Sequence, residues 1–212
     1  RQAVEGELMQ RRLGKAVRLE ISSDCPNDIS KLLQREFNLN EDDVYRCDGP
    51  VNLMRLNQLP NMTDNNSCKF EEFKPSTNKN LRAGQNIFES INKNDILLHH
   101  PFESFFPVVD FLVQAANDPN VIAIKQTLYR TGPDSPIVDA LIKAAQNGKE
   151  VTVPIELKAR FDEQDNIALA GRLQDSGAIV VYGVVGHKTH AKMILVVRRE
   201  GKRLRRYVHI GT

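Results

Sequence analysis

The spacing of apolar residues changes near Asp95 and divides the chain into two regions. In the first region, apolar residues at 17, 19 and 21 alternate with charged ones, which predicts a half-buried strand. Helical spacing follows over residues 29–37, and residues 44–47 predict a short strand. Residues 61–80 are polar and aperiodic, which is typical of a long surface connection. The first region is therefore predicted to be a small α+β unit.

From Asp95 onward, strand patterns alternate with helical patterns. Apolar positions predict an amphipathic helix over 105–116, and Pro136 and Gly148 predict the start and the end of a second helix. The other expected elements are strands at 121–128, 151–157 and 178–182, a helix over 165–176, and a strand through His190. Pro154 predicts an edge position or a local break in pairing.

Continuous apolar strands alternating with helices predict an α/β fold, with a mostly parallel mixed sheet flanked by helices. Functional sites of such sheets form beyond the carboxyl ends of the strands. Residues in the loops that follow strands are therefore the first candidates for chemistry.

The segment His190-Ala191-Lys192 is the strongest candidate. Residues i and i+2 of a strand point to one face, so we expect the imidazole and the ammonium to lie side by side. A neutral imidazole can attack phosphorus, and a fixed cation beside it stabilises charge on phosphoryl oxygens. The pattern H-x-K also occurs by chance, and a buried structural histidine is the alternative for His190.

Two arginines follow predicted strands. Arg130 comes after the strand that ends near Tyr129, and Arg160 after the strand that ends near Ala159. A guanidinium binds phosphate bidentately and stays charged at any relevant pH. Together with His190, the two arginines predict a phosphate site, although a single arginine after a strand would be ordinary.

Other polar residues have weaker claims. Asp162 and Glu163 could orient an imidazole or bind a metal, but acids also favour a helix N-terminus. His187 lies outside the same-face spacing and is expected to be a loop histidine. His99-His100 precedes a proline at a helix start, with a structural role expected and a site-lining role as the alternative. His209 lies on the last predicted strand, residues 207–210, and has no assigned role.

Composition narrows the class of protein. A net charge of +2 carries no general signature of polyanion or nucleic-acid binding, and 41% hydrophobic residues suffice for a core. The 3 cysteines show no metal-ligand spacing and suit a reducing cytoplasm. No apolar run approaches the roughly 20 residues of a membrane span, and no signal peptide opens the chain. The glycine-rich loops of common nucleotide sites are absent from the sequence.

Residues 198–206 contain six basic side chains. Glu200-Gly201 predicts a hairpin turn, so a solvated hairpin tip is the favoured interpretation. The alternative is a surface that attracts polyanions or acidic lipids.

Several blocks in one order resemble the central part of long bacterial polyphosphate kinases, which elongate inorganic polyphosphate from ATP. The similarity is dense from about residue 90 and looser before it. The blocks are residues 44–53, 98–102, 123–130, 144–153, 156–167, 190–192 and 207–212. Glu156 to Ile167 is the most specific of them.

The resemblance implies a phospholipase D-like fold in which two H-x-K halves face one active site. It makes His190 the phosphorylated histidine and Lys192 a phosphate-binding residue. It associates Arg130 and Arg160 with Mg²⁺ and phosphate, and because a guanidinium has no lone pair, we expect contact through bound phosphate. Residues 1–90 would be part of a head domain, and residues 91–212 the first phospholipase D-like catalytic domain.

The implied reaction moves the γ-phosphoryl group of ATP to His190 and then to the end of polyphosphate, and it is reversible with ADP. The sequence holds one H-x-K, so we expect a piece of a longer protein that is inactive alone. The whole protein is expected to be a cytoplasmic dimer or tetramer without transmembrane segments or nucleic-acid partners, with peripheral membrane association as an option. The alternatives are a phospholipase D-type phosphodiesterase and a non-catalytic module for polyanion binding or assembly.

Overall fold

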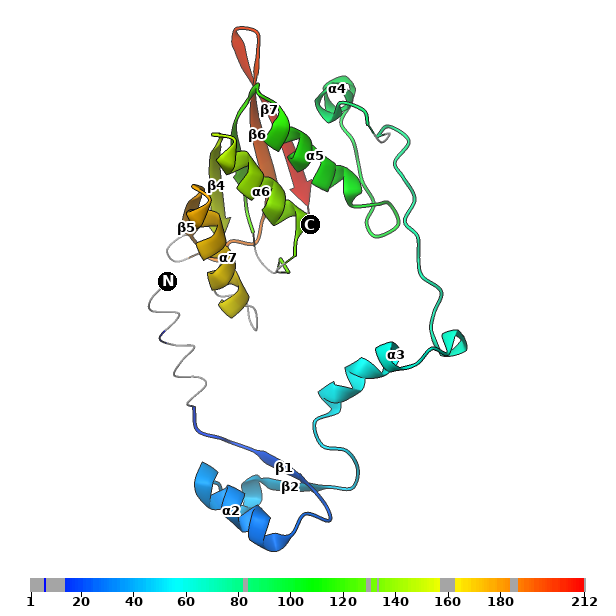
Figure 1. Cartoon of the computed structure of the whole chain (residues 1–212), viewed down its shortest axis with the longest axis vertical. Coiled ribbons are helices and arrows are strands. Elements are labelled where there is room, and N and C mark those ends of the chain that lie inside the picture. The colour runs from blue at the N-terminus through cyan, green and yellow to red at the C-terminus, as the bar shows by residue number, and fades with distance from the viewer. Residues whose placement is uncertain are drawn as a thin grey trace. The chain divides into compact units, whose positions relative to one another are not determined.

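The computed structural model describes Gly6 and the ranges 14–81, 84–128, 131–132, 134–156, 163–183 and 187–211. The chain divides into two compact units, one of residues 7–73 and one that includes residues 74–212 (Figure 1). The domain division expected at residue 90 stays a prediction.

The first unit contains a strand, a helix and a strand, as the sequence predicts. Strands β1 (Leu19–Ser22) and β2 (Val44–Cys47) pair in parallel, and α2 (Asn27–Phe37) connects them. The guanidinium of Arg46 donates to the carbonyl of Cys25 at 2.9 Å and to Asn27 Oδ1 at 2.7 Å, which ties β2 to the start of α2. The remaining elements are α3 (Leu59–Met62) and 3₁₀ turns at Glu41–Asp43, Leu53–Gln58 and Asn66–Cys68.

The second unit alternates helices with strands. Its helices are α4 (Ile87–Lys93), α5 (Phe106–Asn117), α6 (Pro136–Gln146) and α7 (Glu163–Asp175). Its strands are β3 (Val121–Gln126), β4 (Glu150–Ile155), β5 (Ile179–Tyr182), β6 (Lys192–Glu200) and β7 (Arg203–Gly211). The predicted boundaries of α6 hold, because Ser135 precedes Pro136 at its start and Gly148 follows it with a φ of 79°.

The five strands form one sheet in the order β5-β4-β3-β6-β7. Strands β3, β4 and β5 pair in parallel, whereas β6 pairs antiparallel with both β3 and β7. Four strands therefore run in one direction and β6 runs against them. The predicted α/β class with a mostly parallel mixed sheet is confirmed.

Helices α5, α6 and α7 lie side by side over one face of this sheet (Figure 1). Leu112, Leu141 and Leu173, one from each helix, are fully buried, as are Ile124 and Val196 of the sheet. On the other face, the exposed apolar side chains of β5 and β7 within the described part of the chain include Ile179, Val181, Leu204, Val208 and Ile210. The helices thus build the core against a single sheet face.

Pro154 lies in β4, which is an inner strand, so the edge position expected as one alternative is wrong. The pairing of β3 with β4 stops at Lys125–Thr152 and resumes as a single bridge between Leu128 and Ile155. The other alternative, a local break in pairing, is the one the structure adopts, because proline lacks the N–H that a continuous ladder needs.

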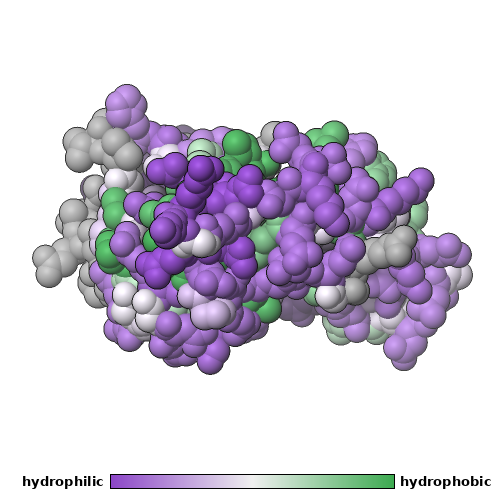
Figure 2. Space-filling model, turned by 90° about the horizontal axis from the view of Figure 1, so that it is seen from above, coloured by the Kyte–Doolittle hydropathy of each residue, from purple (hydrophilic) through white to green (hydrophobic). Residues whose placement is uncertain are grey.

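Strands β6 and β7 are joined by the predicted hairpin turn. Glu200 pairs with Arg203, and Gly201 between them has a φ of 60°, which favours glycine at the first position of a two-residue turn. Much of the surface visible in Figure 2 is hydrophilic. Among the described residues, none of the helices has the length and apolar character needed to span a membrane.

Candidate active site

One end of the five-stranded sheet, called here the carboxyl edge, is where the strand topology gathers the candidate residues. The carboxyl ends of β3, β4, β5 and β7 meet there, because these strands are parallel to one another. Since β6 runs the other way, its first residue, Lys192, lies at the same edge and pairs with Gly211 at the end of β7. All five strands therefore have an end at the carboxyl edge, where the sequence predicts the functional site.

His190 and Lys192 lie side by side at this edge. The Nζ atom of Lys192 is 3.2 Å from each ring nitrogen of His190. The imidazole is exposed, so the buried structural alternative does not apply. One expectation is wrong in detail: β6 begins at Lys192, and His190 belongs to the loop before the strand. Although His190 lies outside the strand, its side chain still contacts that of Lys192, two positions further along the chain.

Two side chains from neighbouring strand ends hold the loop around His190. The Thr127 hydroxyl donates to the carbonyl of Ala191 at 2.6 Å and accepts from the N–H of Met193 at 3.0 Å. The Glu156 carboxylate accepts from the N–H of Thr189 at 3.0 Å. Sequence reasoning did not single out either side chain; the available signal was a polar residue directly after each buried strand.

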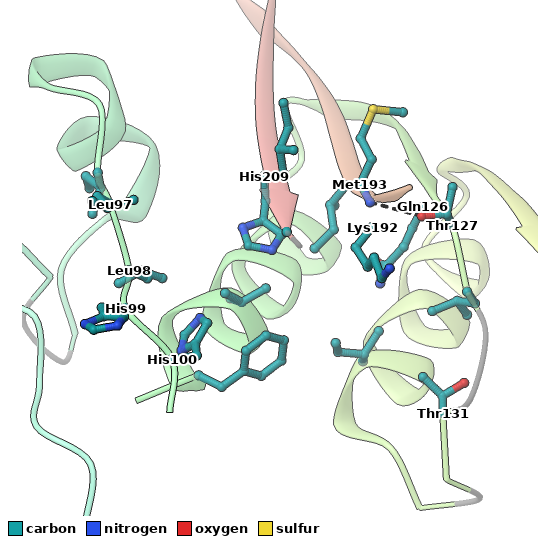
Figure 3. Close-up of a pocket in the computed structure, with 18 residues that line it drawn as sticks. Leu97, Leu98, His99, His100, Gln126, Thr127, Thr131, Lys192, Met193 and His209 are labelled. Atoms are coloured by element: carbon teal, nitrogen blue, oxygen red, sulfur yellow. Dashed lines mark hydrogen bonds between the residues drawn. The ribbon is translucent and has the colours of Figure 1, made fainter. Parts of the chain in front are cut away.

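A cavity of about 580 Å³ opens beside Lys192 (Figure 3). Much of its wall is apolar, with Phe105, Ile137 and Met193 among the lining residues. Gln126 Oε1 and Thr131 Oγ1, in two of its lining residues, are buried without a hydrogen-bond partner among the described residues. The cavity thus combines apolar walls with a few polar groups, as is typical of small-molecule sites.

Three histidines also line the cavity: His99, His100 and His209 (Figure 3). The site-lining role kept as an alternative for His99-His100 agrees with this position. His100 Nδ1 lies 3.0 Å from the carbonyl oxygen of Glu103. A carbonyl oxygen only accepts hydrogen bonds, so Nδ1 of His100 carries a proton and donates it. Burial lowers the pKa of His209, and the nearby His100 lowers it further.

The remaining predicted residues are distributed as follows. Arg130, Arg160 and Asp162 lie outside the described residues. Glu163 is buried at the start of α7, which fits its expected helix-entry role. His187 is exposed in the loop before His190. In the described ranges, no group of three or more His, Cys, Asp or Glu side chains is placed to hold a metal ion.

Comparison with known proteins supports one family. A family model described as polyphosphate kinase C-terminal domain 1 matches residues 86–212, and one described as polyphosphate kinase middle domain matches residues 1–59. The polyphosphate kinase of Pseudomonas aeruginosa is 54% identical over 99% of this chain and 30% of its own length. That of Xylella fastidiosa is 57% identical over 99% of this chain and 30% of its own length.

A solved structure agrees. The crystal structure of polyphosphate kinase from Porphyromonas gingivalis matches with a TM-score of 0.67 and 32% identity, over 88% of this chain and 28% of that one. The chain spans about 30% of the length of the curated relatives it matches. With its fold and both family matches in agreement, the chain belongs to the polyphosphate kinase family.

Proposed function

We propose that this chain supplies half of the active site of a kinase that moves the γ-phosphoryl group of ATP to inorganic polyphosphate through a phosphohistidine at His190. The observation that carries the proposal is the 3.2 Å contact between the Lys192 ammonium and the His190 imidazole at the carboxyl edge of the sheet. Membership of the polyphosphate kinase family supports the substrates.

The first step is an attack by a neutral ring nitrogen of His190 on the γ-phosphorus. A nitrogen–phosphorus bond forms, the bond to the bridging β,γ-oxygen breaks, and ADP leaves with that electron pair. Lys192 lies where its positive charge can stabilise the oxygens of the transferred group. In the second step an oxygen of the terminal phosphate of polyphosphate attacks the phosphohistidine and the nitrogen–phosphorus bond breaks. The reverse sequence makes ATP from ADP.

Arg130 and Arg160 complete the proposal as phosphate-binding residues. The residues that precede the two arginines support this role. Leu128, two residues before Arg130, forms a β-bridge with Ile155, five residues before Arg160, at the carboxyl edge of the sheet. Bidentate guanidinium contacts would suit the equatorial phosphoryl oxygens. Mg²⁺ enters the proposal as a companion of the ATP phosphates, whose oxygens are the ligands it prefers.

The proposal is tested in the full-length protein with γ-labelled ATP. We expect protein-bound label that is acid-labile and base-stable, and its complete loss in His190→Ala. His187→Ala is the matched control, because it removes an exposed histidine from the same loop. Label that persists in His190→Ala, or that is lost equally in His187→Ala, would refute His190 as the phosphorylated residue.

The proposal extends to the whole protein. We propose a cytoplasmic homo-oligomer, with optional peripheral membrane association, in which residues 1–90 belong to a head domain and residues 91–212 to the first catalytic domain. A second H-x-K half in the same protein would face His190, so residues 1–212 alone should not synthesise polyphosphate. Steady ATP-dependent polymer formation by this chain alone would overturn that part of the proposal.

A further inference from the structure

We propose that Thr127 and Glu156 are positioning residues that hold the backbone on both sides of His190 and thereby set the direction of its imidazole. This inference rests on the proposed role of His190. Neither side chain needs to touch the substrate. Each acts through the main chain of the loop that carries the histidine.

Thr127 holds the C-terminal side of the loop. Its hydroxyl donates to the carbonyl of Ala191 at 2.6 Å and accepts from the N–H of Met193 at 3.0 Å. Its own N–H donates to the carbonyl of Met193 at 3.1 Å. A hydroxyl can donate and accept at once, whereas the methyl group of valine, with the same shape, can do neither. Thr127 is therefore suited to hold both a carbonyl and an N–H of the segment that follows His190.

Glu156 holds the N-terminal side. Its carboxylate accepts from the N–H of Thr189 at 3.0 Å, although the residue is only 8% exposed. The main chain of Glu156 is anchored in turn, since its N–H donates to the carbonyl of Leu128 at 3.3 Å and its carbonyl accepts from Asn166 Nδ2 at 3.2 Å. A hydrogen bond to an ionised acceptor is stronger than one between neutral groups. The residue directly before His190 is thus tied to a rigid strand end.

The two contacts come from adjacent strands. Thr127 directly follows β3 and Glu156 directly follows β4, and these strands also lead to Arg130 and Arg160. These contacts attach the His190 loop to the ends of β3 and β4. They thereby fix the His190 imidazole relative to the two strand ends that lead to Arg130 and Arg160. Because nucleophilic attack depends on sub-ångström placement, loss of either contact should slow phosphoryl transfer more than it weakens ATP binding.

The test uses the full-length protein and compares four variants. Thr127→Val removes the hydroxyl and keeps the shape, and Thr127→Ser keeps the hydroxyl. Glu156→Met removes the acceptor at similar length. Thr152→Val, on β4, is the matched control for a threonine-to-valine change in the same sheet. The measurements are the single-turnover rate of protein labelling from γ-labelled ATP, the KM for ATP, and the melting temperature.

We expect Thr127→Val and Glu156→Met to lower the labelling rate by ~10–100-fold, with KM within about 3-fold of wild type. Thr127→Ser should recover most of the rate, and Thr152→Val should match wild type. A wild-type rate in Thr127→Val would overturn the inference. A lower labelling rate in Thr127→Val that Thr127→Ser does not restore would also overturn it. The same holds if the rate falls only because the variant melts below the assay temperature. Failure of the proposed function is recognised separately, because His190→Ala would then still be labelled.

Discussion

Arg198 of β6 and Asp118, which directly follows α5, form an ion pair between segments 80 residues apart, with 2.7 Å between Nε and Oδ2. Both side chains are partly buried. Burial acts to raise the pKa of Asp118, but the hydrogen bond from Arg198 and the N–H of Asn120 oppose it, and the net pKa is lowered. The pair fastens the end of helix α5 to the end of β6 that lies opposite Lys192.

We predict that Asp118→Asn lowers the free energy of unfolding by about 1–3 kcal/mol at pH 7, because it removes the closer of the two carboxylates that pair with the partly buried guanidinium of Arg198. Since the folded-state pKa of Asp118 is lowered, its stabilisation is present above the unfolded pKa of about 3.9 and is lost as pH falls through the folded value. The wild-type advantage should therefore shrink below about pH 4. Urea unfolding at pH 7 and at pH 3.5 measures both effects.

Asp139→Asn is the control for this prediction, because the ion pair of Asp139 with Arg172 is exposed, at 3.6 Å. Exposed pairs contribute about 0–1 kcal/mol. Equal losses in the two variants would contradict the role assigned to the buried pair.

His209 should make the protein sensitive to mild acid. Its pKa is lowered by burial and by His100, so the folded state takes up the proton less readily than the unfolded chain does. Stability is therefore expected to fall as pH drops below about 6.5, the usual histidine pKa. Lys192 lines the same cavity as His100 and His209. The melting temperature of wild type should fall more between pH 7.5 and 5.5 than that of His209→Gln. Identical pH profiles would contradict the prediction.

Gly211 is expected to tolerate only a small side chain. A Cβ atom at this position would lie 3.3 Å from Cβ of Lys192 and 3.4 Å from Nε2 of His209. Gly211→Ala requires shifts of a few tenths of an ångström and should keep most of the activity. Gly211→Val adds two methyl groups against Lys192 and, in the full-length protein, should lower kcat for the proposed polyphosphate synthesis by at least about 10-fold. Equal kcat values in the two variants would show that space beside Lys192 is not limiting.

The basic hairpin tip is expected to be dispensable for phosphoryl transfer. Lys192 pairs with Gly211 at one end of the β6–β7 ladder, and Glu200 pairs with Arg203 at the other. At ~3.3 Å per residue the two ends are about 26 Å apart. Arg205 and Arg198 are already paired with Glu200. In the full-length protein, the triple variant Lys202→Gln/Arg203→Gln/Arg206→Gln should keep kcat for the proposed polyphosphate synthesis within about 2-fold of wild type.

Polyphosphate binding at increasing salt provides the second measurement for this variant. A large loss of affinity together with a flatter salt dependence would favour the polyanion-binding surface over the solvated tip. Unchanged binding would support the solvated tip.

Much of the secondary structure and one feature of the site were predictable from local pattern. The alternation at Leu19 and Ile21, the proline that starts α6 and the glycine that follows it each act over a few residues, so the printed order of side chains suffices. The proximity of His190 to Lys192 is predictable for the same reason, since two residues in an extended segment are neighbours in space as well as in sequence. The exact start of β6 was missed because strand ends depend on the partner strand.

The clamps on the histidine loop could not be predicted in this way. Thr127 and Glu156 lie 64 and 33 residues from their main-chain partners. Pro154 allowed two interpretations, and the position of β4 inside the sheet chose between them. Such contacts depend on which strands become neighbours.

The amino-acid sequence by itself determined most of the helices and strands, although not α3 or α4, and the side-by-side placement of an imidazole and an ammonium, because these follow from backbone periodicity over short distances. Tertiary structure alone decided that β6 runs antiparallel beside β3, which brings Lys192 to the edge where the parallel strands end. It also decided which polar side chains reach the His190 loop. Strand order and loop anchoring arise from packing between residues far apart in the chain, and no local pattern encodes those partners.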